Sequence, residues 1–199
     1  MADIKIEDIK KLKELSGAGL TDAKVALVEA KGDFDKALEA MRKKGLTKAE
    51  KRGDRETREG LIDAYVHDGR IGAIVEVNCE TSFVAKTDEF KDLAHKIAMQ
   101  VASMNPMYVS EADIPEAELL KVRKAAEEEL KNDKKPENVK QQIIDGKVKK
   151  AFEEKVLMNQ PYILDDSKTV EAFIKDAIAK TGENIAVKQF KRIELGVVE

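Results

Sequence analysis

The chain has 199 residues, 42% of them hydrophobic and 38% charged, which is enough apolar material for a core beneath a strongly charged surface. Its 36 basic and 39 acidic residues give a net charge of −3, which argues against nucleic-acid binding through phosphate neutralisation. The single Cys79 excludes an intramolecular disulfide framework and a multi-cysteine zinc site, and two histidines alone cannot build a His-rich metal centre. No apolar run approaches the roughly 18–20 residues that span a bilayer, and no secretion signal opens the chain, so we expect a cytoplasmic protein without a membrane segment.

Residues 1–45 are predicted to form three short helices, which must pack on one another because helices this short are marginal alone. The first ends at Ser16–Gly19, the second opens at Leu20 and is closed by Gly32, and the third is capped by Asp33 and ends at Gly45. Their apolar positions are Ile6, Ile9, Leu12 and Leu15, then Val25, Leu27 and Val28, then Phe34, Ala37, Leu38 and Met41. We therefore expect a three-helix domain over 1–45.

Residues 46–59 change character, since nine of these fourteen residues are charged. We interpret them as a solvated linker, partly helical at most, that lets the small domain move relative to the rest. Basic side chains within 48–58 suggest RNA binding, but interleaved acidic residues cancel most of their charge.

Residues 60–79 are predicted to form a β-hairpin around the turn Asp68-Gly69. The first strand has Ile62, Ala64 and Val66 on one face. The second strand has a common apolar face formed by Ala73, Val75, Val77 and Cys79.

The remaining residues are predicted to be mainly helical. An amphipathic helix spans 88–104, and a charged excursion over 111–158 is divided by Pro136 and Gly146 into three helices, the last of them ended by Pro161. A final helix starts at Ser167 or Thr169, and a strand of uneven alternation follows from 184 to about 195, which indicates a bulge or burial on both faces. The sum is an α+β core over 60–199, with an antiparallel sheet of about three strands packed against helices.

Several motifs have simple structural explanations. Gly17-Ala18-Gly19 follows a helix and lacks the Gly-Lys-Ser/Thr of a phosphate-binding loop, so we interpret it as a turn. Asp165-Asp166 is explained by capping of the helix that follows. Cys79 with His67 or His95 lacks an orienting third residue, and a buried strand thiol is the better interpretation of Cys79.

The segment Glu76–Ala85 leaves the hairpin and enters the turn before the helix at 88–104. Phe83 lies in this connection, where side chains tend to be exposed and functional. The alternative is that Phe83 folds back onto the core, and packing considerations alone favour that alternative.

Two long motifs closely resemble the signatures of the translation elongation factor Ts family. They are Leu12-Lys13-Glu14-Leu15-Ser16-Gly17-Ala18-Gly19-Leu20-Thr21-Asp22-Ala23-Lys24-Val25-Ala26-Leu27 and the segment Glu76–Ala85. Both motifs occur in the family's order and at its spacing. The segment 184–196 resembles the family's closing strand, and the resemblance covers essentially the whole chain. The length is similar to the family's short form, with one sheet-bearing subdomain.

The resemblance implies a guanine nucleotide exchange factor that binds elongation factor Tu and promotes release of GDP, with no catalytic residue, cofactor or metal of its own. It implies that 1–45 is similar to a ubiquitin-associated fold that docks on the GTPase through the turn Gly17, Gly19 and the following Leu20 and Thr21. The family's exchange loop matches Thr81, Ser82, Phe83, Val84 and Ala85, and its Phe inserts near the partner's Mg²⁺ and phosphates.

Three departures from the family pattern affect these expectations. Ser82 replaces an Asp, which removes a charge but keeps a hydroxyl that can shape the turn. Thr21 replaces an apolar residue, so Leu20 must carry most of that anchor. Short-form relatives are expected to pair as homodimers in a two-plus-two complex with the GTPase. Some of them tie that interface with a Cys in the last strand. Here Lys191 occupies the neighbourhood and the strand has no Cys, so the expected dimer is non-covalent.

Other classes of protein explain less of the sequence. A helical adaptor acting through 1–45 accounts for the first motif but not the second. A ribosome- or RNA-associated protein accounts for the charged linker, against a net charge of −3. An enzyme is the weakest alternative.

Overall fold

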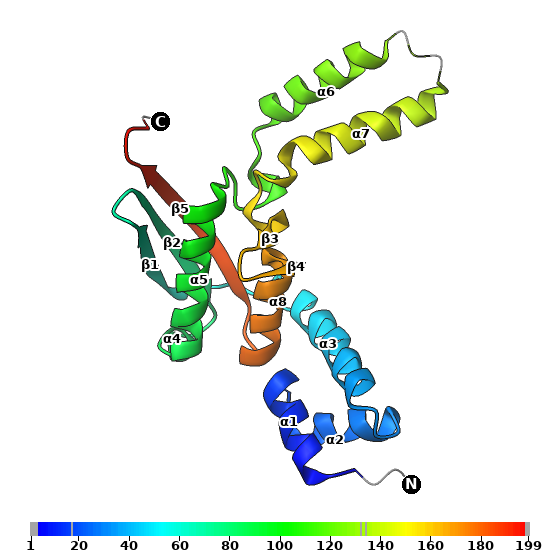
Figure 1. Ribbon diagram of the computed structural model, residues 1–199, viewed down its shortest axis with the longest axis vertical. Helices are drawn as coiled ribbons and strands as arrows, with labels where there is room; N and C mark the ends of the chain where they lie inside the picture. The colour runs from blue at the N-terminus through cyan, green and yellow to red at the C-terminus, as the bar shows by residue number, and fades with distance from the viewer. Residues whose placement is uncertain (1–3, 17, 132, 134, 198–199) are drawn as a thin grey trace. The chain divides into compact units, whose positions relative to one another are not determined.

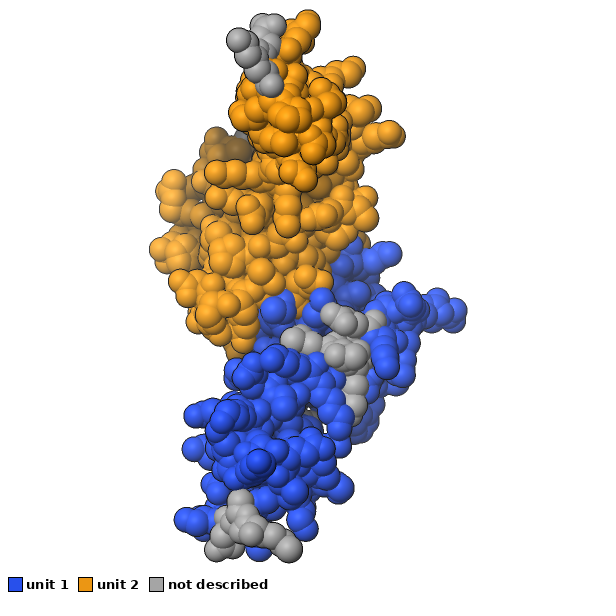
Figure 2. Space-filling model, turned by 90° about the vertical axis from the view of Figure 1, so that its right-hand side faces the viewer, with its two compact units in different colours: residues 1–63, 76–95, 172–188 blue, residues 64–75, 96–171, 189–199 orange. Residues whose placement is uncertain are grey.

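The computed structural model describes residues 4–16, 18–131, 133 and 135–197. The chain divides into two compact units, coloured separately in Figure 2: residues 1–63, 76–95 and 172–188 form unit 1, and residues 64–75, 96–171 and 189–199 form unit 2. Helices combine with an antiparallel sheet in the order β1-β2-β5, which confirms the expected α+β class. The strands are β1 (Glu59–His67), β2 (Ile71–Cys79) and β5 (Ile185–Glu194), labelled in Figure 1.

The first three helices of unit 1 are α1 (Ile6–Ser16), α2 (Leu20–Glu29) and α3 (Phe34–Glu50). They share a small core of buried residues: Ile9, Leu12, Ala23, Ala26, Leu27, Ala37 and Met41. The expected apolar stripe of α1 is only partly buried, because Ile6 and Leu15 face solvent. Val25 and Val28 of α2 are also exposed. The buried face is therefore narrower than the apolar pattern predicts.

The connection between α2 and α3 confirms one predicted cap and corrects the other. Asp33 caps α3 as expected, since its Oδ1 accepts a hydrogen bond from the Lys36 N–H at 3.1 Å. The first left-handed residue after α2 is Lys31, at φ 54°, and not the predicted Gly32. The N–H of Lys31 donates to Val28 O and that of Gly32 donates to Leu27 O, which is a Schellman motif with Lys31 at its C′ position.

The prediction that α3 ends at Gly45 is wrong, because the helix continues to Glu50. A Cβ at Gly45 would lie 3.1 Å from Ala179 Cβ, so glycine serves close packing at this point and does not end the helix. Ala49 is buried, and Arg52 Nη1 donates to Ile178 O at 3.5 Å. The charged segment is thus held against the rest of unit 1 at these positions.

The predicted hairpin is confirmed. Asp68 and Gly69 have φ of 49° and 67°, and Arg70 N–H donates to His67 O, which together define a type I′ turn. The second strand buries its predicted apolar face. Ile62 and Val66 do share a face of β1, but that face is exposed.

Helix α5 (Asp88–Met104) matches the predicted span. The excursion that follows contains two long helices, α6 (Glu116–Leu130) and α7 (Glu137–Glu153), which lie side by side in Figure 1. The predicted break at Gly146 is wrong, because this glycine lies inside α7. Ala126, Leu130 and Ile144 form the buried contact between the two helices.

The structure contains a short hairpin that the sequence pattern does not predict, in which β3 (Pro161–Tyr162) pairs with β4 (Asp165–Thr169). Asp165 therefore lies in a strand and does not cap a helix, which corrects that expectation. Its Oδ1 accepts hydrogen bonds from the Ser167 N–H and hydroxyl, and the hydroxyl bond is the main reason that the pKa of Asp165 is lowered.

A buried pair of amide side chains joins α5 to this hairpin within unit 2. Gln100 Nε2 donates to Gln160 Oε1 at 3.1 Å, and Ile163 N–H donates to Gln100 Oε1 at 2.9 Å. Gln160 Nε2 in turn donates to Glu154 O at 2.7 Å. The fully buried amides thus have partners for their polar atoms, as low-dielectric burial requires.

The chain closes with α8 (Val170–Thr181) and β5, as predicted. Burial along β5 changes parity between Val187 and Phe190, which is the effect of an extra residue in a strand. Two 3₁₀ turns, Glu111–Asp113 and Leu157–Asn159, and the short helix α4 (Ser82–Ala85) complete the elements. No helix in the described part of the chain is long and apolar enough to cross a membrane.

Candidate functional site

The loop between β2 and α5 contains the short helix α4 (Figure 1), and Phe83 is its second residue. Phe83 is 81% exposed, so the alternative that it folds onto the core is wrong. Val84 and Ala85 are buried beneath it. Thr81 and Ser82 before the ring are exposed and the two residues after it are buried, so α4 is anchored in the protein on the side that follows Phe83.

Thr81 begins α4 as its N-cap, with extended backbone at φ −129° and ψ 150°. Its Oγ1 accepts from Val84 N–H at 3.4 Å, and its carbonyl accepts from Ala85 N–H at 3.2 Å. Thr87 repeats the arrangement for α5, since its Oγ1 accepts from Phe90 N–H at 3.2 Å. The backbone is therefore held by a cap on each side of α4, by Thr81 before it and by Thr87 after it.

The carboxylate of Glu183, which lies two residues after the end of α8, holds this N-cap. Glu183 Oε1 accepts from the Thr81 hydroxyl at 2.6 Å, and Glu183 Oε2 accepts from Thr81 N–H at 3.0 Å. Asn184 N–H donates to Glu80 Oε1 at 2.6 Å, and Arg55 Nη1 lies 3.4 Å from the same oxygen. These contacts connect the segment before α4 to the α8–β5 connection.

The second predicted site lies at the start of α2. Gly19 is its N-cap with extended backbone at φ −67° and ψ 153°, and Gly17 lies outside the described residues. Leu20 is 54% exposed and Thr21 is also exposed. The side chain that the family resemblance implies as the apolar anchor is thus exposed.

The weak candidates for chemistry do not form a reactive site. Cys79 is buried, as predicted, and its Sγ donates to Thr81 O at 3.2 Å. Burial, reinforced by the Glu183 carboxylate, raises the pKa of the Cys79 thiol above its ordinary value, which makes the thiol less reactive. His95 Nδ1 is paired with Asp63 at 2.8 Å. Among the described residues, no group of three or more His, Cys, Asp or Glu could hold a metal ion.

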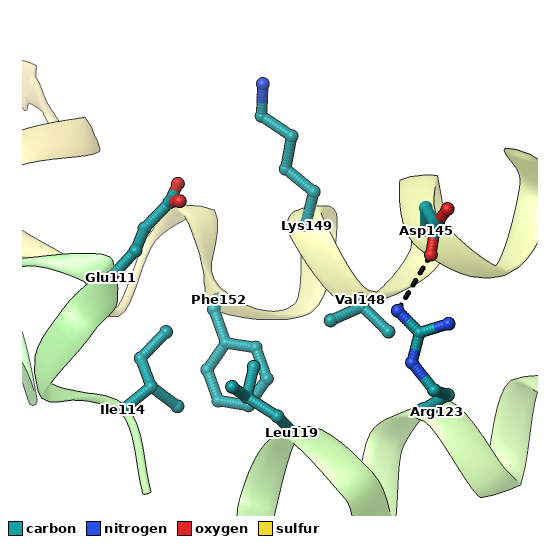
Figure 3. Close-up of a pocket in the computed structure, with 8 residues that line it drawn as sticks. All are labelled: Glu111, Ile114, Leu119, Arg123, Asp145, Val148, Lys149 and Phe152. Carbon is teal, nitrogen blue, oxygen red and sulfur yellow. Dashed lines mark hydrogen bonds and ion pairs between the residues drawn. The ribbon is translucent and has the colours of Figure 1, made fainter. Parts of the chain in front are cut away.

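Unit 2 has a pocket of about 380 Å³ at the base of the α6–α7 pair, which no sequence signal indicates (Figure 3). Ile114, Leu119 and Phe152 form its apolar side, while Lys149 points away from it. Arg123 is paired with Asp145 at 2.8 Å on its rim. This pairing leaves neither Arg123 nor Asp145 as an unpaired charge with which the pocket could select a ligand.

Comparison with known proteins identifies relatives over almost the whole chain. The family model described as Elongation factor TS matches residues 5–197. Elongation factor Ts of Thermotoga maritima is 51% identical over 195 residues, which cover 98% of this chain and 97% of that protein. Elongation factor Ts of Moorella thermoacetica is 49% identical over 190 residues, covering 95% and 94% of the two chains. The similarity therefore includes both the helical domain and the Phe83 loop.

Proposed function

We propose that this protein binds elongation factor Tu carrying GDP and inserts Phe83 to release the nucleotide. The chain belongs to the elongation factor Ts family, and is thus a translation elongation factor with a nucleotide-exchange role. The observation that carries this proposal is the 81% exposure of Phe83 on a turn capped at both ends. Solvent-exposed aromatic rings on fixed turns are suited to fill a pocket in another protein.

The mechanism follows from thermodynamic linkage. The chain needs to bind the nucleotide-free GTPase more tightly than the GDP-bound one, and GDP then weakens the complex by the same factor that the complex weakens GDP binding. A ring inserted between packed helices shifts them between discrete arrangements, because packed interfaces do not deform smoothly. Displacing the partner's Mg²⁺ would remove the largest local positive charge that screens the phosphates of GDP.

Docking and exchange are assigned to different segments. Leu20, half-exposed at the start of α2, supplies an apolar contact that persists in both nucleotide states. Phe83 supplies the contact that differs between the states. Thr21 and Ser82 are exposed neighbours of these two residues and lie at the edge of each contact.

The proposed homodimer buries the outward face of the sheet. Val66, Ile74 and Ile193 are large aliphatic side chains that are exposed on β1, β2 and β5. A groove of about 790 Å³ lies at the last half of β5, where Lys191 lies, and is also lined by residues 105–107, which follow α5. The single Cys79 is buried, so the proposed dimer is non-covalent and leads to a two-plus-two complex with the GTPase.

The direct test is release of labelled GDP from purified elongation factor Tu, measured with and without this protein. We expect release to become faster and to saturate as the protein concentration rises. Release at the intrinsic rate at every concentration would refute the proposed function.

A further inference from the structure

We infer that Glu183 is a positioning residue for exchange: it holds Thr81, and through Thr81 the turn that presents Phe83. This inference rests on the proposed function of Phe83. Glu183 does not reach the partner's nucleotide in this assignment, and it acts through the geometry of the turn. The residue lies 102 positions from Thr81 in the chain, outside both family-like motifs.

The geometry of the contact is specific to a carboxylate of this length. Its two oxygens accept from two donors of one residue, the Thr81 hydroxyl at 2.6 Å and the Thr81 N–H at 3.0 Å. Hydrogen bonds to a charged acceptor are shorter and stronger than neutral ones. Because the hydroxyl donates to Glu183, its lone pairs stay available to accept from Val84 N–H, which starts α4.

Local backbone structure places Glu183 beneath the turn. Helix α8 ends at Thr181, and Gly182 follows with φ 78°, a left-handed conformation that reverses the chain. Thr181 Oγ1 then accepts from Glu183 N–H at 3.4 Å. The connection is therefore shaped before the carboxylate meets Thr81.

Asn184 fixes the other side of the same connection. This side chain is buried, and its Nδ2 donates to Gly53 O at 3.2 Å and to Arg55 O at 2.7 Å. Its backbone N–H donates to Glu80 Oε1 at 2.6 Å. Thr81 is thus held by Glu183, and the residue before it by Asn184, so the support of the turn has two adjacent points.

For exchange, the consequence is that one residue supports the turn and another contacts the partner: Glu183 holds the turn, and Phe83 inserts. A side chain on a mobile turn would lose conformational freedom on insertion, which reduces the binding energy available to shift the partner. Loss of the Glu183 contact would therefore lower the rate of GDP release at saturation and leave the concentration for half-saturation nearly unchanged, since Leu20 still docks.

The test compares Glu183→Ala and Glu183→Gln with Glu153→Ala, a control that removes an exposed glutamate from α7. In the free protein, hydrogen exchange at the Val84 and Ala85 amides should become about tenfold faster in Glu183→Ala, because a hydrogen bond to a charged group is lost. The Gln variant can still accept from Thr81 N–H, so it should recover part of the protection. Equal exchange in all variants would overturn the inference.

Release of labelled GDP from elongation factor Tu supplies the functional arm. We expect a saturating rate about tenfold lower for Glu183→Ala, an intermediate rate for the Gln variant, and no effect of the control. In a Phe83→Ala background the Glu183 change should have no further effect, because both act through one ring. If Phe83→Ala lowers the saturating rate of GDP release and Glu183→Ala does not, the positioning role alone is overturned. If Phe83→Ala leaves that rate unchanged, the proposed function is overturned.

Discussion

Truncation of Phe83 to Ala is the perturbation that tests the exchange mechanism most directly. The ring is 81% exposed in the free chain, so its full insertion into a partner removes about 160 Å² of mostly apolar surface from water. At about 25 cal/mol per Å² this burial contributes about 4 kcal/mol, of which Ala retains the small part that belongs to Cβ. We therefore expect a loss of about 3 kcal/mol, or about 100-fold, in exchange-competent binding.

The assay is stopped-flow release of a fluorescent GDP from elongation factor Tu over a range of exchange-factor concentrations. Because the ring is exposed, Phe83→Ala should melt at the same temperature as the unmodified chain, which separates function from folding. Leu164→Ala is the matched control, since it removes another exposed apolar side chain, one that lies in the turn between β3 and β4. A saturating rate for Phe83→Ala equal to that of the Leu164 control would refute the reasoning.

Three further substitutions, the last with a matched control, test other parts of the structure. Leu20→Ala should raise the half-saturating concentration about fivefold without changing the saturating rate, because about 1 kcal/mol of burial is lost at a docking contact, and the same release assay measures both quantities. Ile74→Asp, on the outward face of β2, should reduce the molar mass from light scattering to the 22.2 kDa of one chain, and an unchanged dimer mass would exclude that face as the interface. Gly60→Ala should lower the free energy of unfolding by about 2 kcal/mol or more in urea denaturation, since its φ is 155° and a Cβ there would lie 2.2 Å from Val77 O. Gly72→Ala, with no atom within 4 Å of its Cβ, is the control that should unfold nearly as the unmodified chain does.

Elements specified by neighbouring residues were predictable from the sequence. Asp68-Gly69 determines its own turn, because these residue types tolerate positive φ at the two positions that a type I′ turn requires. The helix at 88–104 carries a regular apolar face, and Asp33 caps α3 through a residue three positions away. In each case the residues that determine the element lie within the element itself or a few positions from it.

The errors arose where distant packing outweighs local preference. Glycine in a helix costs about 1 kcal/mol relative to alanine, which is small enough that both Gly45 and Gly146 lie inside helices. At Gly45 the reason is the close approach of Ala179, 134 positions later in the chain. The alternation of β1 likewise predicts which residues share a face, but it does not say whether protein or solvent covers that face.

The candidate site shows the same division between local and distant causes. The pattern around Phe83 indicates a connection between strand and helix, but only the structure shows that the ring is exposed while Val84 and Ala85 are buried. Thr81 caps α4 through a residue three positions away, but its contact with Glu183 joins residues 102 positions apart. A single sequence carries no periodicity or spacing rule that connects such a pair.

The Glu183–Thr81 contact explains how an exposed Phe83 ring could change the nucleotide affinity of a partner. An exchange factor changes nucleotide affinity only to the extent that it binds two states of its partner with different affinities. A ring on a mobile turn could adjust to either state, and its contacts would then differ little between them. The Glu183 carboxylate holds Thr81 through two hydrogen bonds. We expect this contact to limit that adjustment, so that the same buried area discriminates more strongly against the GDP-bound form. In the proposed mechanism, rigidity behind Phe83, and not its apolar area alone, converts partner binding into nucleotide release.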